Sequence, residues 1–123
     1  MTTPQKTFPR NGEVWLVNTP NQPNDPQQPR TAIVVSTSGR NEFASNVIVV
    51  PTTSSIGRPH PRVHVHIPAG EGGLSKDSYA RCDQVTTIDK VLLERGPLGP
   101  PIHLSYRWRI VNAVRSALGD TFL

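Results

Sequence analysis

A row of hydroxyl side chains follows directly on an apolar run in VIVVPTTSS, residues 47–55. The branched apolar residues at its start predict a buried strand, and Pro51 predicts the end of backbone pairing on one side, because proline has no N–H to donate. Thr52, Thr53 and Ser54 then offer hydrogen-bond donors and acceptors at the end of a rigid element. Hydroxyl clusters after strands are most often turns, so local sequence leaves a turn and a polar site as alternatives.

A second group able to do chemistry is the histidine-rich stretch RPHPRVHVHI, residues 58–67. His64 and His66 alternate with apolar residues and share the polar face of a predicted strand, with His60 nearby in sequence. Imidazoles bind zinc or act as general acid and base. A zinc site needs three or four ligands, and no carboxylate or cysteine has a recognisable spacing to these histidines, so we expect no metal. Solvated imidazoles and imidazoles in a substrate groove are the other interpretations.

The composition bounds the class of protein. The 123 residues suffice for one domain with a single core, and 13 Lys and Arg against 9 Asp and Glu give a formal charge of +4 that mildly favours polyanionic partners. Cys82 is the single cysteine, which excludes an internal disulfide and favours a reducing compartment. No apolar stretch has the length of a membrane span and the start lacks the apolar segment of a signal peptide, so we expect a cytoplasmic protein without membrane contact.

Strand-like runs dominate the first three quarters of the chain. They are Gly12–Asn18, Thr31–Thr37, Asn46–Thr52, Arg62–Ile67, Ser78–Ile88 and a brief run at 91–93, with a turn predicted at 38–45. The last segment changes to helical spacing, with Tyr106, Ile110, Val111, Val114, Ala117 and Leu118 on one face, Ser105 as N-cap and Gly119 as C-terminal stop. Strands in sequence followed by one helix predict a mainly β (α+β) fold in which an antiparallel, curled sheet is capped by a C-terminal helix.

Two segments fall outside this pattern. Residues 1–9 are polar with two prolines and predict a flexible tail before a single domain at 10–123. Residues 19–30, TPNQPNDPQQPR, carry prolines at every third position and no apolar residue, which predicts a long exposed loop.

Five blocks, NGEVWLV, PRTAIVVS, VIVVPTTSS, PAGEGGLSKDS and CDQVTTIDK, occur in the order and spacing of the MazF/PemK-like toxins. Over residues 10–118 the chain resembles this family. The resemblance implies a small SH3-like barrel of five to seven antiparallel strands that works as a homodimer. It also implies a toxin of a toxin–antitoxin system, an mRNA interferase that cleaves single-stranded RNA without metal or other cofactor and is restrained by a cognate antitoxin.

The family's motifs place a catalytic arginine before the second core strand and a catalytic threonine after the third, which match Arg30 and Thr53 here. RNA carries its own nucleophile, the 2′-hydroxyl, so the expected products are a 2′,3′-cyclic phosphate and a 5′-hydroxyl. Arg30 stays protonated and suits charge stabilisation on the phosphoryl oxygens, and Thr53 offers a donor to a phosphoryl oxygen or the reacting hydroxyl. Histidine as general acid or base is the alternative mechanism.

Further RNA contacts are expected of Thr52, Ser54, Asp83, Gln84, Arg40 and Arg58. The Thr52–Thr53 doublet leaves the register open by one position. The chain departs from the family at Thr31, where proline is usual, and at Thr86, where arginine is usual. The second departure removes a positive charge, which predicts altered base selection or RNA affinity. Two alternatives stay open: a toxin of this fold that binds DNA gyrase without cutting RNA, and a catalytically silent module that binds antitoxin.

Overall fold

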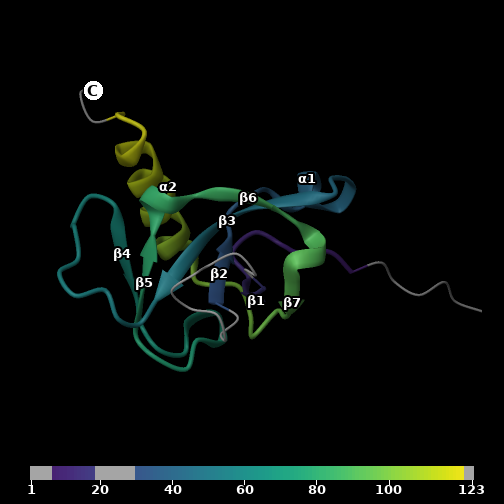
Figure 1. The fold of residues 1–123 in the computed structure, drawn as a ribbon, viewed down its shortest axis with the longest axis horizontal. Coiled ribbons are helices and arrows are strands. Elements are labelled where there is room, and N and C mark those ends of the chain that lie inside the picture. The colour runs from purple at the N-terminus through teal and green to yellow at the C-terminus, as the bar shows by residue number, and fades with distance from the viewer. Residues whose placement is uncertain (1–6, 19–29, 121–123) are drawn as a thin grey trace, which may run out of the picture.

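The computed structural model describes residues 7–18 and 30–120, in which seven strands form one antiparallel sheet of order β4-β5-β3-β2-β1-β7, with β6 on β3 (Figure 1). The strands are β1 (Val14–Val17), β2 (Arg30–Val34), β3 (Asn46–Thr53), β4 (His64–Ile67), β5 (Ser78–Arg81), β6 (Thr86–Asp89) and β7 (Leu93–Arg95). The helices are α1 (Ser38–Phe43) and α2 (Leu104–Ala117), with 3₁₀ turns η1 (Glu71–Gly73), η2 (Cys82–Gln84) and η3 (Lys90–Leu92). The predicted mainly β fold, a small SH3-like barrel with a C-terminal helix, is confirmed.

Strand β3 is the central strand and changes partners along its length. Its first part pairs with β6 and β2, and its last two residues, Thr52 and Thr53, pair with β5. Pairing with β2 runs to Ala32 opposite Pro51, the position at which proline predicts its end. The end of β3 therefore leaves one half of the curled sheet and enters the other, carrying its hydroxyl residues to the junction (Figure 1).

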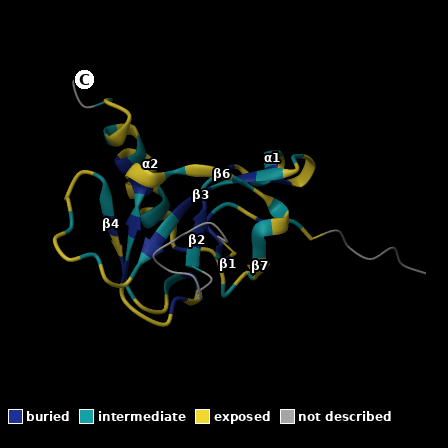
Figure 2. Ribbon diagram, viewed as in Figure 1, coloured by how far each residue is buried: buried dark blue, intermediate teal, exposed yellow. Residues whose placement is uncertain are grey.

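The sheet is apolar on both faces and separates two clusters of buried side chains, rather than enclosing the single core expected. Ile33 and Val50 belong to the larger cluster, which α2 covers, whereas Ala32 and Val49 belong to the smaller cluster on the other face. The alternation of β-strand side chains explains why neighbours in sequence fall in different clusters. Figure 2 shows the buried residues concentrated along β2, β3 and the inner side of α2.

The predicted buried face of α2 is correct in part, because Ile110 lies in the larger core cluster and Tyr106 and Val114 pack against it. Ile110 and Ala113 are buried, but Val111 and Leu118 are exposed, and the helix is capped by His103 instead of Ser105, because the His103 side chain accepts a hydrogen bond from the Ser105 N–H at 3.1 Å. At 100° per residue, a face centred on 110 and 113 turns 111 and 118 toward solvent. The predicted stop is confirmed, since Gly119 follows the helix with φ +96°.

Two predicted elements divide differently in the structure. The predicted turn at 38–45 contains the short helix α1. Its buried residue is Asn41, which forms hydrogen bonds with Ser36 and with the carbonyl of Pro9. Because a polar residue anchors this helix, its sequence shows no apolar periodicity. The predicted strand Ser78–Ile88 is broken by η2, because β5 pairs with the end of β3 and β6 with its beginning. The run at 91–93 contributes Leu93 alone to β7, since η3 occupies Lys90–Leu92.

The predicted tail and loop lie partly outside the described residues. Pro9, assigned to the predicted tail, is buried, and its carbonyl accepts a hydrogen bond from the Asn41 side chain. Of the predicted loop at 19–30, residues 19–29 are not described, and Arg30 is the first residue of β2 rather than part of a loop. Within the described ranges, none of the helices combines the length and apolarity that crossing a bilayer requires.

Candidate functional site

A cavity of about 410 Å³ lies where β2 begins and β3 ends. It is lined by both expected catalytic residues, Arg30 and Thr53, and by Thr52 and Ser54. Lys76 lines it from the turn before β5. Among the described residues that line it, Arg30 and Lys76 carry positive charge and none is acidic, so the cavity suits an anionic group.

The register of β2 against β3 brings the two expected catalytic residues to the same level. The pairs run from Val34 opposite Val49 to Ala32 opposite Pro51, and continuing this register sets Thr31 against Thr52 and Arg30 against Thr53. The first of these continuations is supported by a hydrogen bond between the hydroxyl groups of Thr31 and Thr52. Cross-strand neighbours of this kind lie about 5 Å apart at Cβ, which allows both side chains to reach one substrate group.

The two threonines of the doublet have different environments. Thr52 is 4 % exposed, and its hydroxyl donates to the carbonyl oxygen of Thr31 at 3.3 Å in addition to its bond with the Thr31 hydroxyl. Thr53 is half-buried at the cavity, and its Oγ1 accepts a hydrogen bond from the Ser55 N–H at 3.1 Å. Within the described residues the Thr53 hydroxyl proton has no acceptor, so it is available to a bound group. Thr53, not Thr52, is therefore the better placed donor.

Lys76 was not predicted as a site residue. The turn that carries it is held by Asp77, whose Oδ1 accepts from the Ala69 N–H at 2.8 Å, and by Ser78, whose hydroxyl donates to the Lys76 carbonyl at 3.0 Å. The glycine-rich part of PAGEGGLSKDS forms η1, in which Gly73 has φ +86°. The lysine in the same block was the available signal, but sequence alone does not say that this turn faces the end of β3.

A second cavity of about 340 Å³ adjoins the first and shares Arg30, Thr31 and Thr52 with it. The expected RNA-binding residue Gln84 lines it, as does Thr86, the position of the family departure. Arg81 lines it as well and was not predicted.

Three expected RNA-binding residues line neither cavity. The Arg40 guanidinium donates to the Asn46 carbonyl at 3.0 Å and so ties α1 to the start of β3. Arg58 is exposed in the connection between β3 and β4, and Asp83 is exposed in η2 with its Oδ1 3.7 Å from His64 Nε2. Arg30, Thr52, Thr53 and Ser54 share the first cavity and Gln84 lines the adjoining one, whereas Arg40, Arg58 and Asp83 line neither.

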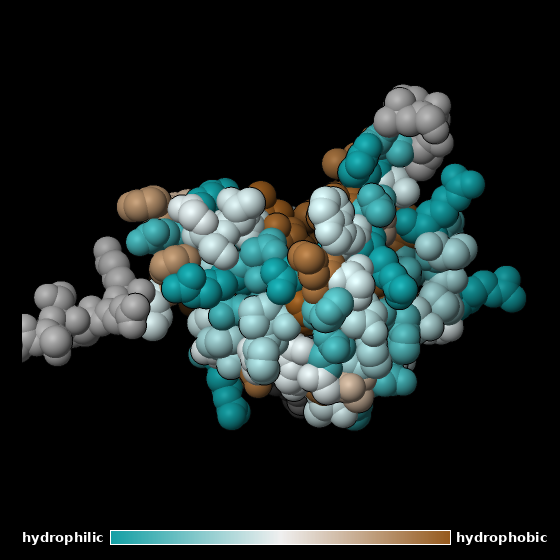
Figure 3. Space-filling view, turned by 180° about the vertical axis from the view of Figure 1, so that it is seen from behind, coloured by the Kyte–Doolittle hydropathy of each residue, from teal (hydrophilic) through white to brown (hydrophobic). Residues whose placement is uncertain are grey.

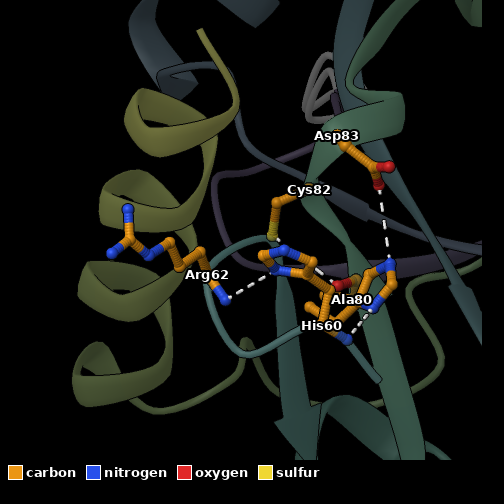
Figure 4. A network of polar contacts seen from close by, with 6 residues as sticks. His60, Arg62, Ala80, Cys82 and Asp83 are labelled. Carbon is orange, nitrogen blue, oxygen red and sulfur yellow. Dashed lines mark hydrogen bonds and ion pairs between the residues drawn. The ribbon is translucent and has the colours of Figure 1, made fainter. Parts of the chain in front are cut away.

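The histidines form a separate network on the β4 side (Figure 4). His64 Nδ1 accepts from the His60 N–H at 2.7 Å, so Nε2 carries the proton and faces Asp83. His60 Nδ1 accepts in turn from the Arg62 N–H at 3.2 Å. These imidazoles order the connection into β4 and line neither cavity. Among residues 7–18 and 30–120, no group of three or more His, Cys, Asp or Glu side chains is arranged to hold a metal ion.

Cys82, next to this network, is fully buried, and its thiol contacts the Ala80 carbonyl oxygen at 3.7 Å (Figure 4). Burial, with a smaller contribution from the Asp83 charge, raises the pKa of the Cys82 thiol to about 12. A thiol that stays protonated is a poor nucleophile, so Cys82 is a core residue.

The comparison with protein families decides the assignment. A family model described as PemK-like, MazF-like toxin of type II toxin–antitoxin system matches residues 10–106. The chain belongs to this family. Among curated members, it is 29 % identical to the endoribonuclease MazF of Staphylococcus epidermidis over 86 residues, which are 69 % of this chain and 72 % of that one. It is likewise 29 % identical to the endoribonuclease MazF of Staphylococcus saprophyticus over 82 residues, 66 % of this chain and 68 % of that one.

Solved structures of similar fold include a Mycobacterial endoribonuclease and a MazF protein. A Mycobacterial endoribonuclease, solved in complex with its cognate antitoxin, matches with a TM-score of 0.75 at 20 % identity, covering 94 % of this chain and 99 % of that one. MazF from Deinococcus radiodurans matches with a TM-score of 0.75 at 21 % identity, covering 93 % and 99 %. At these identities the likeness establishes the fold, and the seven-stranded sheet with its C-terminal helix is that of the PemK/MazF toxins.

Proposed function

We propose that this member of the family is the toxin of a toxin–antitoxin pair and a metal-independent, sequence-selective endoribonuclease that cleaves single-stranded RNA, mRNA in particular. The observation that carries the proposal is that Arg30 and Thr53 line one cavity from opposing strands. The curated relatives named endoribonuclease MazF support the same reaction class.

The reaction follows from the chemistry of RNA and of the two side chains. The 2′-oxygen attacks the adjacent phosphorus and the bond to the 5′-oxygen breaks, which leaves a 2′,3′-cyclic phosphate and a 5′-hydroxyl. Negative charge grows on the non-bridging oxygens, where the Arg30 guanidinium presents a fork of donors. The free hydroxyl proton of Thr53 suits the same oxygens. A preorganised donor of this kind contributes about 3–4 kcal/mol to the transition state.

Proton transfer is the step for which the cavity offers the fewest groups. The Arg30 guanidinium already carries its proton and so has no lone pair with which to act as a general base. Histidines are absent among the described residues that line the cavity. We therefore assign Arg30 and Thr53 to charge stabilisation and to holding the 2′-hydroxyl in line with the leaving oxygen. In this open, polar cavity, water is expected to take the 2′-proton and to protonate the leaving 5′-oxygen.

Two protein partners belong to the proposal, a cognate antitoxin and a second copy of the chain. A Mycobacterial relative of the same fold was solved with its antitoxin, which supports the first. An exposed apolar stripe on α2 supports the homodimer, and its members are Leu104, Trp108, Val111 and Leu118. Figure 3 shows apolar side chains gathered in a band on the back of the molecule, between hydrophilic margins. Such a surface in a small protein is typical of an interface.

The test is incubation of the purified protein with a long single-stranded RNA in EDTA, followed by mapping of both ends of every product. We expect discrete cuts with 5′-hydroxyl and cyclic-phosphate ends, loss of all cuts in Arg30→Ala, and full activity in Arg115→Ala, an arginine at the far end of α2. Intact RNA together with trapped gyrase–DNA complexes would replace the proposal with the gyrase-binding alternative. Intact RNA with retained antitoxin binding would favour the silent module.

A further inference from the structure

We propose that the second cavity is a phosphodiester subsite in which Arg81 binds the RNA phosphate next to the scissile one. The identity of the ligand rests on the proposed endoribonuclease function, whereas the anion site itself rests on the geometry of the cavity. Arg81 is thereby a binding residue that neither the sequence motifs nor the family resemblance indicated.

Strand alternation directs Arg81 to this cavity. Its neighbour Ala80 is fully buried in the larger core cluster, so Arg81, next along β5, faces the opposite side of the sheet. Thr52 pairs with Ala80, and extending this antiparallel register by one residue places Arg81 opposite Pro51. Pro51 also lines the cavity. The Arg81 side chain therefore reaches the cavity across the end of β3.

The guanidinium of Arg81 has an unmet need for an acceptor. Its Nε is inaccessible to solvent and makes no hydrogen bond, and within the described ranges no carboxylate pairs with Arg81. An N–H group withdrawn from water without an acceptor costs roughly 1–3 kcal/mol, and more when the group is charged. A phosphate bound in the cavity would offset that cost through its attraction for the positive charge of the guanidinium.

The lining of the cavity favours an anion over a cation or an apolar ligand. Among the described residues that line it, Arg81 and Arg30 are the charged ones and none is acidic. Gln84 and Thr86 add neutral hydrogen-bonding groups at its edge, while Val49 and Ile88 form apolar wall. Apolar walls reduce the local dielectric constant, which strengthens the attraction between two guanidinium groups and a phosphate.

Continuity with the first cavity indicates that the anion is part of an RNA chain. Both cavities are lined by Arg30, Thr31 and Thr52, so they meet at the arginine proposed to bind the scissile phosphate. A polynucleotide cut in its interior must extend in both directions from that phosphate. The first cavity accommodates one neighbouring nucleotide and the second the other.

Position 86, where the family usually carries arginine, lines the same cavity as Arg81. Thr86, on β6, and Arg81, on β5, line the same cavity from different strands. A positive charge placed at either position would act on the same volume. Arg81 thus supplies positive charge to the cavity that Thr86 lines, although Thr86 itself carries none.

The test measures binding of a short 2′-O-methyl RNA of randomised sequence, which lacks the nucleophile and cannot be cut, as a function of salt concentration. Each phosphate contact on a single strand contributes about 0.7 to the slope of log affinity against log salt. We expect Arg81→Leu to reduce the slope by about 0.7, and Arg81→Leu with Thr86→Arg to restore it. Arg62→Leu, an exposed arginine that lines neither cavity, is the matched control and should leave the slope unchanged.

The single variant Thr86→Arg tests the cavity independently of Arg81→Leu. It adds a positive charge at an exposed strand position, so we expect it to increase the slope of log affinity against log salt by about 0.7. An unchanged slope in folded Arg81→Leu, or no effect of Thr86→Arg, overturns the subsite. Loss of affinity in Arg81→Leu for a glutamate-rich peptide but not for RNA overturns the RNA assignment in favour of a carboxylate ligand. If the slopes change as expected but the wild-type protein does not cleave RNA, only the endoribonuclease function is refuted. If the protein cleaves RNA but the slopes do not change, only the subsite is refuted.

Discussion

The hydroxyl groups of Thr31 and Thr52 are hydrogen-bonded to each other across β2 and β3. The pair satisfies two polar groups at the edge of the larger core and fixes the register at the point where β3 leaves β2 for β5. It also commits Thr52 to the fold and leaves the next hydroxyl, on Thr53, level with Arg30 at the cavity. The geometry of the proposed site thus depends on a contact made one residue away from it.

Substitution of the two threonines should separate stability from activity. Thr52→Val keeps the side-chain shape but removes the bonds to Thr31, so we expect a loss of about 1 kcal/mol in the free energy of unfolding and RNA cleavage within a fewfold of wild type. Thr53→Val should unfold like wild type but cleave about a hundredfold more slowly, and Thr53→Ser should retain most activity. Urea unfolding and single-turnover cleavage measure the two effects, and the reverse assignment would favour Thr52 as the donor.

Lys76 should contribute to RNA affinity with little effect on the chemical step. Its side chain lines the cavity but belongs to an exposed residue, so solvent screens its attraction for phosphate. We expect Lys76→Ala to weaken RNA binding by roughly tenfold or less, and Lys76→Arg to retain binding. Titration with uncleavable RNA checks this, and a larger loss in cleavage rate at saturating RNA than in affinity would instead make Lys76 part of the reaction.

Because of the raised pKa of the Cys82 thiol, we expect the free energy of unfolding to fall at alkaline pH. Because its pKa is raised to about 12 in the folded protein, the thiol ionises first in the unfolded chain, which then binds fewer protons. The free energy of unfolding therefore falls as pH rises from about 9 toward 12, by up to about 1.4 kcal/mol per pH unit. Cys82→Ala lacks this contribution, so the stability difference between wild type and variant should shrink over that range in urea unfolding. A difference independent of pH would contradict the assignment.

The apolar stripe on α2 should determine the oligomeric state. Trp108 is 61 % exposed in the single chain and lies near the centre of the stripe. We expect sedimentation equilibrium to give a dimer for the wild type and a monomer for Trp108→Glu, since burying a carboxylate in an apolar interface is costly. Asn112→Glu adds the same charge at an exposed polar position of α2 and should leave the dimer intact. A monomeric wild type would exclude this stripe as a self-association surface.

The mainly β fold with its C-terminal helix could be predicted from local patterns, whereas the pairing of Arg30 with Thr53 was expected from the resemblance to the MazF/PemK-like toxins. Apolar runs mark the strands whatever their partners are, and the proline in VIVVPTTSS marks the end of pairing with β2. What the sequence missed depends on contacts distant along the chain. Asn41 stabilises α1 through hydrogen bonds rather than apolar spacing, and the face of α2 is set by which turn packs on the sheet.

The proposed binding residues divide in the same way. Thr52 and Ser54 follow from the position of β3, but Arg81 requires the knowledge that β5 crosses the end of β3. Arg40 was expected in the site from its charge alone, and its side chain is instead bonded to Asn46. Residue type indicates what a side chain is able to do, and the strand pairing determines where it does it.

The measurement that tests the central claim most directly is a double-mutant cycle on the single-turnover cleavage of a short RNA containing one mapped site. The enzymes compared are wild type, Arg30→Ala, Thr53→Val and the double variant. If both side chains act on one phosphodiester, their effects are strongly non-additive, and the double variant is about as slow as the slower single variant. Losses that multiply in the double variant, or cleavage that survives both substitutions, would contradict the account.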